Sequence, residues 1–456
     1  MKNCRNSQYY YCKTTPMLKK AQMIKMKIII VWGISFFTGF ASLNAQIPNT
    51  ISKEDKIFGL SKFWMEVNYN FIYLDKFGKE QWDSVYKASL ISIAETKNDL
   101  EYYRELQRIC ALLQDGHTNI YFPDGLRRKY MVAPAFFTRL IDGKVVVTDI
   151  GNDTLWINGL TIGTEILAVN GKDVMDYVAQ YILPYTSASI IQDKEIRAYF
   201  YDLLLGPREE NLLLKVKNIN GEIKSITVPR SMRWRNTNVA KPTISYELLP
   251  GNIGHLMLNS FSDASFNKIF DSIYLKAQNA SALIIDLRNN GGGTSTYGFY
   301  VLQHLVHTSF VSTSWVTKQH IAKLKAGGDP DRLFGTAGRK YLPANKMIYD
   351  KPVVWLTGPK TFSAAEDVSA IFDHIKRGII IGTATAGSTG EPLWFDLPGG
   401  GKARVCTEKD TYPDGREFVG YGVQPGIEVK QTVAGFITNR DEVLEKAIDY
   451  LKTKIK

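Results

Sequence analysis

The stretch that decides the fold reads PVVWLTGPKTFSAAEDVSAIFDHIKRGIIIG and spans residues 352–382. Two continuous apolar runs, 353–356 and 379–381, are of the kind that forms strands buried on both faces of a parallel sheet. Between the runs, apolar side chains recur along one face of a helix, at Ala364, Val368, Ile371, Phe372 and Ile375. A strand, a crossover helix and a second strand make a βαβ unit, so this stretch predicts an α/β core.

Ser363 opens the helix of this unit, directly after a buried strand and a Gly-Pro turn. A helix N-terminus offers unpaired N–H groups, and its dipole favours a developing negative charge. Ser363 is therefore a candidate nucleophile, and the N–H of Ala364 is a candidate donor of an oxyanion hole. Most serines that open a helix are N-caps, and this position alone does not separate the two roles.

A second polar loop follows another predicted buried strand and reads DLRNNGGG over residues 286–293. Adjacent glycines let backbone N–H groups approach a ligand closely, so Gly291 or Gly292 is a candidate for the second oxyanion donor. A phosphate-binding loop is the alternative, but the Lys-Ser/Thr ending of such loops is absent. Ligands of open α/β sheets bind beyond the carboxyl ends of the strands, so this loop and Ser363 are expected to face one crevice.

A serine hydroxyl needs a base to act as a nucleophile, and the chain contains six histidines. His117 lies in a tight turn, after Asp115-Gly116, where catalytic groups are often presented. Spacing alone does not choose His117 over His255. Roles in packing or at the surface are expected for His304, His307 and His374, which fall in helical patterns.

The rest of the chain is assigned by the same periodicities. Residues 50–127 are expected to be mainly helical, with a helix that ends at Asp115-Gly116 and a strand over 117–122. Residues 131–231 are expected to be β-rich, with a tight turn at Asn170-Gly171. Further elements of the α/β region are predicted as strands at 253–258 and 282–287 and a terminal helix near 440–452.

Residues 1–45 have the pattern of a signal peptide. They carry seven basic groups and no acidic ones, and an apolar run over 28–37 is followed by small residues that end at Ala45. The run is shorter than the roughly 20 residues that a membrane span needs. We expect export to the periplasm, cell envelope or medium, with cleavage near Ala45 and no stable membrane insertion afterwards. A retained N-terminal anchor is the alternative.

Charge and cysteine content narrow the possible partners. The net charge is +11, and removing the seven basic groups of the leader leaves +4, with no basic stripe interleaved with aromatics. A nucleic-acid partner is therefore not expected. Cys110 and Cys406 either form one disulfide or are buried thiols. No Cys/His grouping has metal-ligand spacing, so neither a metal nor another cofactor is expected.

In these residues the chain resembles the C-terminal processing (tail-specific) serine peptidases and their tricorn-core relatives. The matching segments follow the family's order over most of residues 100–430: 115–118, 286–293, 363–366 and 422–425. The resemblance implies an α+β multidomain fold. Its parts would be a signal peptide at 1–45, an N-terminal helical region at 46–130 that carries His117, a PDZ-like module at 131–231, and a crotonase/ClpP-like α/β peptidase core at 232–456.

The resemblance also bears on the base. The tail-specific branch uses a Ser-Lys dyad, but Ser388 stands at the position of the Lys, and no Lys lies between Lys376 and Lys402. The tricorn-like branch uses a His, which His117 matches. That branch also has a Ser just before the His and a late Glu, where this chain has Gly116 and Val419. Glu417 is the nearest candidate to orient His117.

Together these features predict an exported serine-type endopeptidase that hydrolyses peptide bonds in peptides or in protein C-terminal regions. Ser363 would be the nucleophile and His117 the base, with the oxyanion held by Ala364 and by Gly291 or Gly292. Its partner would be a peptide or an unfolded protein, which the PDZ-like module could capture by strand addition. The sequence leaves the oligomeric state open. The alternative is a non-catalytic peptide- or ligand-binding protein on the same fold; an acyl-CoA enzyme is disfavoured by the export signal.

Overall fold

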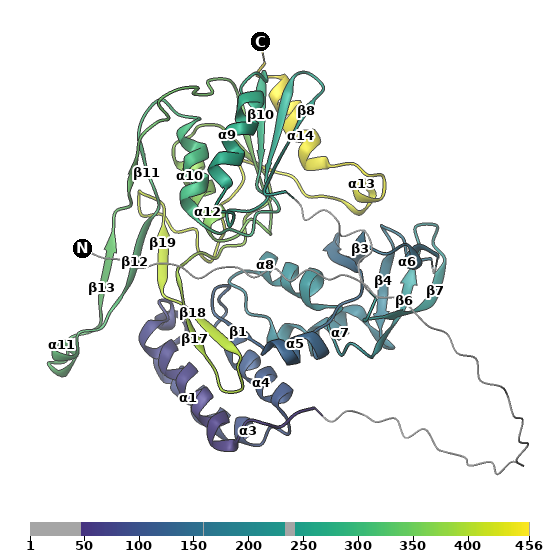
Figure 1. The fold of residues 1–456 in the computed structure, drawn as a ribbon, viewed down its shortest axis with the longest axis vertical. Helices are drawn as coiled ribbons and strands as arrows, with labels where there is room; N and C mark the ends of the chain where they lie inside the picture. Colours follow the sequence, from purple (N-terminus) through teal and green to yellow (C-terminus); the bar gives the residue numbers. More distant parts are fainter. Residues whose placement is uncertain (1–46, 158, 233–241, 456) are drawn as a thin grey trace, which may run out of the picture. The chain divides into compact units, whose positions relative to one another are not determined.

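A six-stranded sheet forms the centre of the C-terminal half of the chain (Figure 1). In the computed structural model, which describes residues 47–157, 159–232 and 242–455, its strand order is β20-β16-β15-β10-β9-β8. Neighbouring strands are parallel except β8, which pairs antiparallel with β9. The strands are β8 (Ile244–Leu249), β9 (Ile253–Leu258), β10 (Ala282–Asp286), β15 (Val353–Thr357), β16 (Ile379–Gly382) and β20 (Ile427–Glu428).

Both faces of this sheet are covered, which explains its continuous apolar runs. Leu283, Ile285 and Trp355 belong to the large hydrophobic cluster on one face, whereas Ile284 and Val354 belong to the cluster on the other face. The covering helices are α9 (Phe266–Ala277), α10 (Ser295–Gln303) and α12 (Ala364–His374) on the first face and α14 (Glu442–Lys452) on the second (Figure 1). The predicted α/β core is confirmed, including the βαβ unit of β15, α12 and β16.

The N-terminal region is mainly helical, as predicted, and shares its hydrophobic cluster with the first face of the sheet. Its elements are α1 (Lys53–Asn70), α2 (Leu74–Phe77), α3 (Lys79–Ala94), α4 (Asp99–Ala111), β1 (Asn119–Tyr121) and α5 (Asp124–Tyr130). The prediction that Asp115-Gly116 ends a helix is wrong. Helix α4 ends at Ala111, and the residue with a left-handed backbone after it is Gln114, at φ 50°.

Residues 136–229 hold a second sheet, in the order β2-β3-β4-β6-β7, with a hydrophobic cluster of its own. The Asn170-Gly171 turn is present, with both residues at positive φ, and a helix over Val174–Tyr181 follows it. The strands are β2 (Phe136–Ile141), β3 (Lys144–Ile150), β4 (Glu165–Val169), β5 (Lys172–Asp173), β6 (Asn211–Lys217) and β7 (Ile223–Pro229). The helical segments are α6 (Asp153–Ile157), α7 (Val174–Tyr181), η1 (Leu183–Tyr185), α8 (Ile191–Glu195) and η2 (Ile196–Asp202).

Smaller sheets connect these parts. Strand β1 pairs antiparallel with β18, which in turn pairs with β17, so a hairpin from the C-terminal half adds to a strand from the N-terminal region. The remaining elements are β11 (Phe310–Val311), β12 (Ser314–Gln319), α11 (Ala322–Ala326), β13 (Arg332–Thr336), β14 (Lys340–Tyr341), β17 (Pro392–Asp396), β18 (Lys402–Cys406), β19 (Glu408–Thr411) and α13 (Val433–Ile437).

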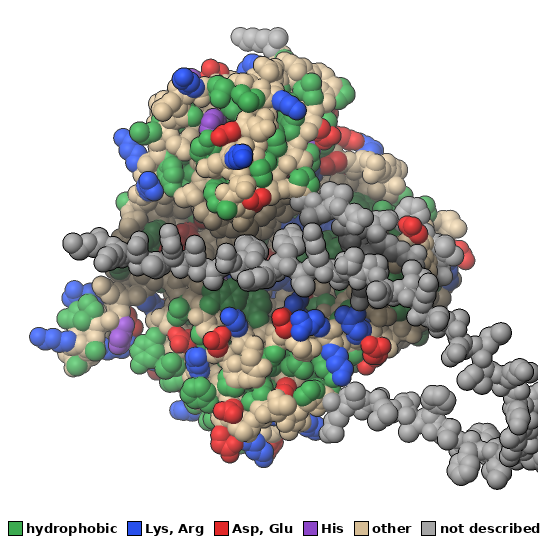
Figure 2. Space-filling model, viewed as in Figure 1, with side chains coloured by type: hydrophobic (Ala, Val, Ile, Leu, Met, Phe, Trp, Pro, Cys, Tyr) green, Lys and Arg blue, Asp and Glu red, His purple; other side chains and the backbone are tan. Residues whose placement is uncertain are grey.

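On the face of the molecule seen in Figure 2, the described residues carry charges of both signs side by side. Within the described residues, no helix combines the length and the apolar character that crossing a membrane requires. The expected signal peptide at residues 1–45 lies outside the described residues.

Candidate active site

Ser363 occupies the junction between β15 and α12 in a backbone conformation that is rare for a residue with a side chain. Its φ is 58° and its ψ is −130°, a strained combination of the kind that concentrates at functional sites. Its N–H donates to the Ser388 carbonyl at 3.1 Å and to a Glu366 carboxylate oxygen at 3.1 Å. The Ser363 carbonyl accepts the Glu366 N–H at 2.7 Å, so the backbone itself satisfies the start of the helix.

His117 faces Ser363 across the site. Its Nε2 lies 3.0 Å from Ser363 Oγ, a hydrogen bond between groups 246 residues apart. Its ring stacks on Phe362 with a centroid separation of 4.5 Å and an interplanar angle of 6°. The backbone N–H of His117 donates to Asp115 Oδ2 at 3.2 Å. The structure therefore brings the predicted nucleophile and the predicted base into hydrogen-bond contact.

The environment of His117 favours its neutral form. The residue is 2% exposed, and this burial lowers the pKa of its imidazole well below the usual range, with further lowering by the positive charges of Arg404 and Arg197. A neutral imidazole with a free lone pair on Nε2 is the form that can take a proton from a serine hydroxyl.

Ser388 contacts the other nitrogen of His117. Its Oγ lies 2.9 Å from His117 Nδ1, and Ser388 is fully buried. When Nε2 is to accept a proton, Nδ1 carries the hydrogen and donates it to Ser388 Oγ. Through its carbonyl, Ser388 also accepts the N–H of Ser363, so one residue contacts both the serine and the histidine.

Gly116 explains how Ser388 reaches the histidine. A Cβ at position 116 would lie 2.7 Å from Ser388 Oγ and 3.0 Å from Ser388 Cβ. The hydroxyl of Ser388 thus takes the space that a side chain directly before His117 would need. Glycine serves here for close approach of the backbone, not for a left-handed turn, because its φ is not positive.

Glu366 holds the two serine-bearing segments together. Its fully buried carboxyl accepts from the N–H of Ser363 and from the N–H of Ser388 at 3.0 Å, from the N–H of Gly387 at 2.6 Å and from Thr385 Oγ1 at 2.6 Å. Burial raises the pKa of Glu366 to about 8, although the hydrogen bonds from these four donors act to lower it. The carboxyl joins the first turn of α12 to the loop after β16.

Two backbone N–H groups near Ser363 remain available for an oxyanion. The N–H groups of Ala364 and Gly291 donate to no acceptor within the described residues. The N–H of Gly292, by contrast, donates to Asn290 Oδ1 at 2.9 Å. Gly292 instead allows the glycine loop to pack closely against the start of α12, since a Cβ at this position would lie 2.8 Å from Ser363 Cβ and 3.1 Å from the Ala364 nitrogen.

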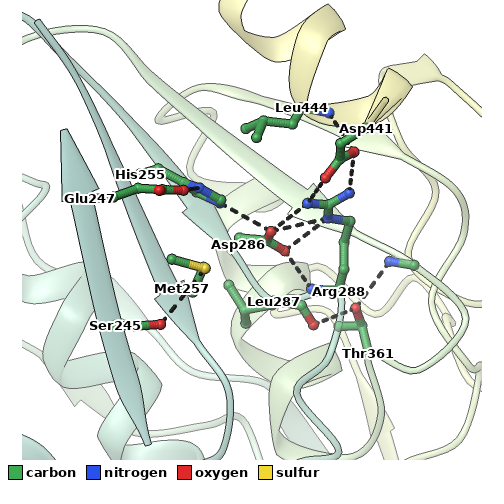
Figure 3. A network of polar contacts seen from close by, with 11 residues as sticks. Ser245, Glu247, His255, Met257, Asp286, Leu287, Arg288, Thr361, Asp441 and Leu444 are labelled. Carbon is green, nitrogen blue, oxygen red and sulfur yellow. Dashed lines mark hydrogen bonds and ion pairs between the residues drawn. The ribbon is translucent and has the colours of Figure 1, made fainter. Parts of the chain in front are cut away.

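A buried ionic network anchors this glycine loop at its start (Figure 3). Arg288 donates to both carboxylate oxygens of Asp286, with its shortest contact at 2.7 Å, and to both oxygens of Asp441, at 2.7 and 2.8 Å. Burial favours the neutral form of Asp286, but Arg288 and His255 outweigh it and hold the pKa of Asp286 below its usual range. His255 bonds Glu247 and Asp286 within this network, whereas His117 is the histidine whose ring contacts Ser363.

Glu417 does not orient His117. Its carboxylate pairs with Lys409, and Ser388 occupies the position beside His117 Nδ1. Cys110 and Cys406 are free thiols, both buried. Each contacts Thr118: Cys110 Sγ lies 3.2 Å from its carbonyl oxygen, and the N–H of Cys406 donates to its hydroxyl. Within the described ranges, no grouping of His, Cys, Asp and Glu could hold a metal ion.

Comparison with known proteins identifies the class of the C-terminal half of the chain. Residues 252–429 match the family model described as "Peptidase family S41". The strand-helix junction with Ser363 and the glycine loop both lie within this segment. The matched segment is therefore an S41 peptidase domain, and the chain is a serine-type peptidase.

Within that class the chain is similar to carboxyl-terminal-processing proteases. It is 25% identical to the one from Picosynechococcus sp. over 404 residues, which cover 83% of this chain and 86% of the relative. It is 21% identical to the one from Synechocystis sp. over 450 residues, which cover 92% and 93%. Mature CPAF, solved in complex with lactacystin, shares the fold at a TM-score of 0.69 and 15% identity, over 88% of this chain and 97% of CPAF.

Proposed function

We propose that the protein hydrolyses peptide bonds in peptides or in the C-terminal regions of proteins, with Ser363 as nucleophile and His117 as general base. The observation that carries this proposal is the 3.0 Å contact between Ser363 Oγ and His117 Nε2, on a serine held in a strained backbone conformation beside two unused N–H groups. The similarity to carboxyl-terminal-processing proteases supports the choice of substrate class.

The reaction would proceed through an acyl-enzyme. His117 Nε2 takes the proton of Ser363 as Oγ attacks the carbonyl carbon of the substrate, and the N–H groups of Ala364 and Gly291 bind the oxyanion. The tetrahedral intermediate collapses, and the leaving amine takes the proton from Nε2. A water molecule then gives its proton to Nε2 and attacks the ester, which releases the carboxylate product and restores the Ser363 hydroxyl.

Ser388 would be the positioning residue of this site. Its hydroxyl accepts from Nδ1 in both the neutral and the protonated imidazole, so it holds the ring plane toward Ser363 throughout the reaction. A hydroxyl can donate as well as accept, so, unlike a carboxylate, it permits both tautomers of the His117 imidazole. It also adds no negative charge beside the imidazolium. This would be a Ser-His-Ser site in which Ser388 replaces the missing side chain at position 116.

Two further assignments belong to this proposal. The sheet of residues 136–229 would be a PDZ-like module that captures an extended peptide by strand addition; its own hydrophobic cluster supports an independent unit. The protein would act outside the cytoplasm after export, on the strength of the leader pattern at residues 1–45.

The experiment is hydrolysis of a quenched fluorescent peptide library by the protein without residues 1–45, with products identified by mass spectrometry. We expect cleavage by the wild type and none by Ser363→Ala, with equal melting temperatures for the two proteins. Cleavage that persists in Ser363→Ala would contradict the proposed nucleophile. A wild type that binds peptides in the library without cleaving any of them would point instead to the non-catalytic alternative.

A further inference from the structure

A cavity of about 800 Å³ lies beside His117. It is lined by β1 and the hairpin β17–β18 on one side and by η2 on another, and the lining includes Asn119, Tyr121, Trp394 and Arg197. This volume is in the range of pockets that bind small ligands or ligand side chains. Arg197 lines the cavity, donates to the carbonyl of Gly116 at 3.2 Å and lies 5.3 Å from the ring centroid of Phe362, so this wall of the cavity reaches the residues that precede His117 and Ser363.

Arg404 lies at the centre of the sheet face that borders this cavity. In the antiparallel pairing, Arg404 is opposite Asn119 on one side and opposite Trp394 on the other, and Tyr121 is opposite Lys402. Residues directly opposite, and residues two apart along a strand, point to the same face of a sheet. The other four residues line the cavity, and Arg404, which is not itself a lining residue, lies among them on the same face of the sheet.

The Arg404 guanidinium is held in place without an ion pair. It lies 5.7 Å from the ring centroid of Tyr121 and 5.4 Å from that of Trp394, and its Nε donates to Asn119 Oδ1 at 2.8 Å. Within the described residues, no carboxylate lies within 4.0 Å of it. Burial lowers the pKa of Arg404, and the positive charge of Arg197 adds to this, whereas Tyr121 and the buried Asp115 oppose it.

Two arginines therefore converge on one backbone carbonyl. Arg404 Nη2 lies 3.4 Å and Arg197 Nη2 lies 3.2 Å from the oxygen of Gly116, the residue before the proposed base. Arg197 is balanced by Asp193, which bonds its Nε at 2.8 Å. Asp202 also lines the cavity, where Arg197 and Arg104 offset its charge. Within the described residues Arg404 forms no ion pair within 4.0 Å, and the buried carboxyl of Asp115 is the nearby acidic group whose charge acts on it.

We propose that this cavity is a substrate subsite for a carboxylate, bound by Arg404 together with Arg197. The proposal rests on the proposed peptidase function and specifies the substrate. A planar guanidinium that packs against aromatic rings is suited to bidentate binding of a carboxylate. The carboxylate would come from an Asp or Glu side chain of the substrate or from the terminus of the substrate chain, and both sources share this chemistry.

Binding of the carboxylate would also assist the reaction. In the free protein the two arginines oppose protonation of His117. A bound anion would offset their charge at the moment when the imidazole takes the proton of Ser363. The benefit should therefore appear in kcat as well as in KM, because the anion stabilises a charge that forms in the transition state.

The test compares matched peptides that a library screen has shown to be cleaved. One pair differs by Glu against Gln at each position near the cleaved bond, and a second pair differs by a free against an amidated C-terminus. We expect kcat/KM to be roughly 10- to 150-fold higher for the carboxylate member of one of the pairs, since hydrogen bonds to charged groups contribute on the order of that factor. The pair that shows the preference identifies the source of the carboxylate.

Variants then assign the preference to the arginine. Arg404→Gln should abolish the difference between the matched peptides, whereas Arg127→Gln should retain it, because Arg127 lines the cavity but is exposed and paired with Asp124. Equal kcat/KM values within both peptide pairs, or a preference that survives in Arg404→Gln, would overturn the subsite. Labelling of Ser363 by a fluorophosphonate distinguishes the two proposals: a wild type that is labelled but shows no preference refutes the subsite alone. If Arg404→Gln does not fold, Arg404→Lys is the second variant, because it keeps the positive charge and loses the planar guanidinium that binds a carboxylate through two N–H groups.

Discussion

Replacement of Ser388 by Ala tests whether its hydroxyl positions the proposed base. The substitution removes the 2.9 Å contact with His117 Nδ1 and leaves the carbonyl that accepts the N–H of Ser363. In the transition state the imidazole is positively charged, and a hydrogen bond to a charged group contributes about 1.5–3 kcal/mol. At about 1.36 kcal/mol for each factor of ten, kcat should fall roughly 10- to 150-fold.

The assay is steady-state hydrolysis of a cleavable peptide, with KM and the melting temperature measured in parallel. KM should change little, because Ser388 is fully buried and does not face the substrate. The matched control is Ser369→Ala, which removes another fully buried hydroxyl, one that bonds Trp355 Nε1 at 2.9 Å, and should leave kcat within a few-fold. A Ser388→Ala variant with wild-type kcat, or an equal loss in Ser369→Ala, would refute the positioning role.

Three further predictions follow from the same geometry. Gly116→Ala should lower both kcat and the melting temperature, since its Cβ would lie 2.7 Å from Ser388 Oγ; an unchanged enzyme would refute the close approach. The value of kcat/KM should fall on the acid side only below pH 6.5, where His117 becomes protonated. Arg404→Gln should move this fall to higher pH, because loss of the positive charge raises the pKa of His117. Arg127→Gln is the control. The folded-state pKa of His117 is below its unfolded value, so the neutral ring contributes stability above about pH 6.5 that is lost as the pH falls. Arg288→Ala should destabilise the fold by about 3–5 kcal/mol, because it leaves the carboxylate of Asp286 buried without its main partner, and chemical denaturation measures the loss.

The sequence predicted the parts of the site that depend on local pattern. The continuous apolar runs around Ser363 required a sheet covered on both faces, and the glycines at 291–293 required a loop at the end of a strand. Both expectations are local consequences of periodicity and turn chemistry, and the structure has both features.

Contacts between distant segments could not be predicted in the same way. The hydrogen bond between Ser388 and His117 joins residues 271 positions apart, and neither segment has a periodicity that points to the other. The choice of Glu417 was wrong because it rested on closeness in sequence to a position in related chains, whereas Lys409 pairs with this carboxylate. Gly116 gave no such signal, because the sequence assigns it to a turn; only its backbone conformation, which is not left-handed, shows that it serves the close approach of Ser388.

The most direct test of the central claim is the rate at which a fluorophosphonate probe modifies the protein, with the labelled residue identified by mass spectrometry. We expect a single modified residue, Ser363, no labelling in Ser363→Ala, and labelling slowed by at least an order of magnitude in His117→Gln. Absence of labelling in the folded wild type, or equal labelling in Ser363→Ala, would contradict it.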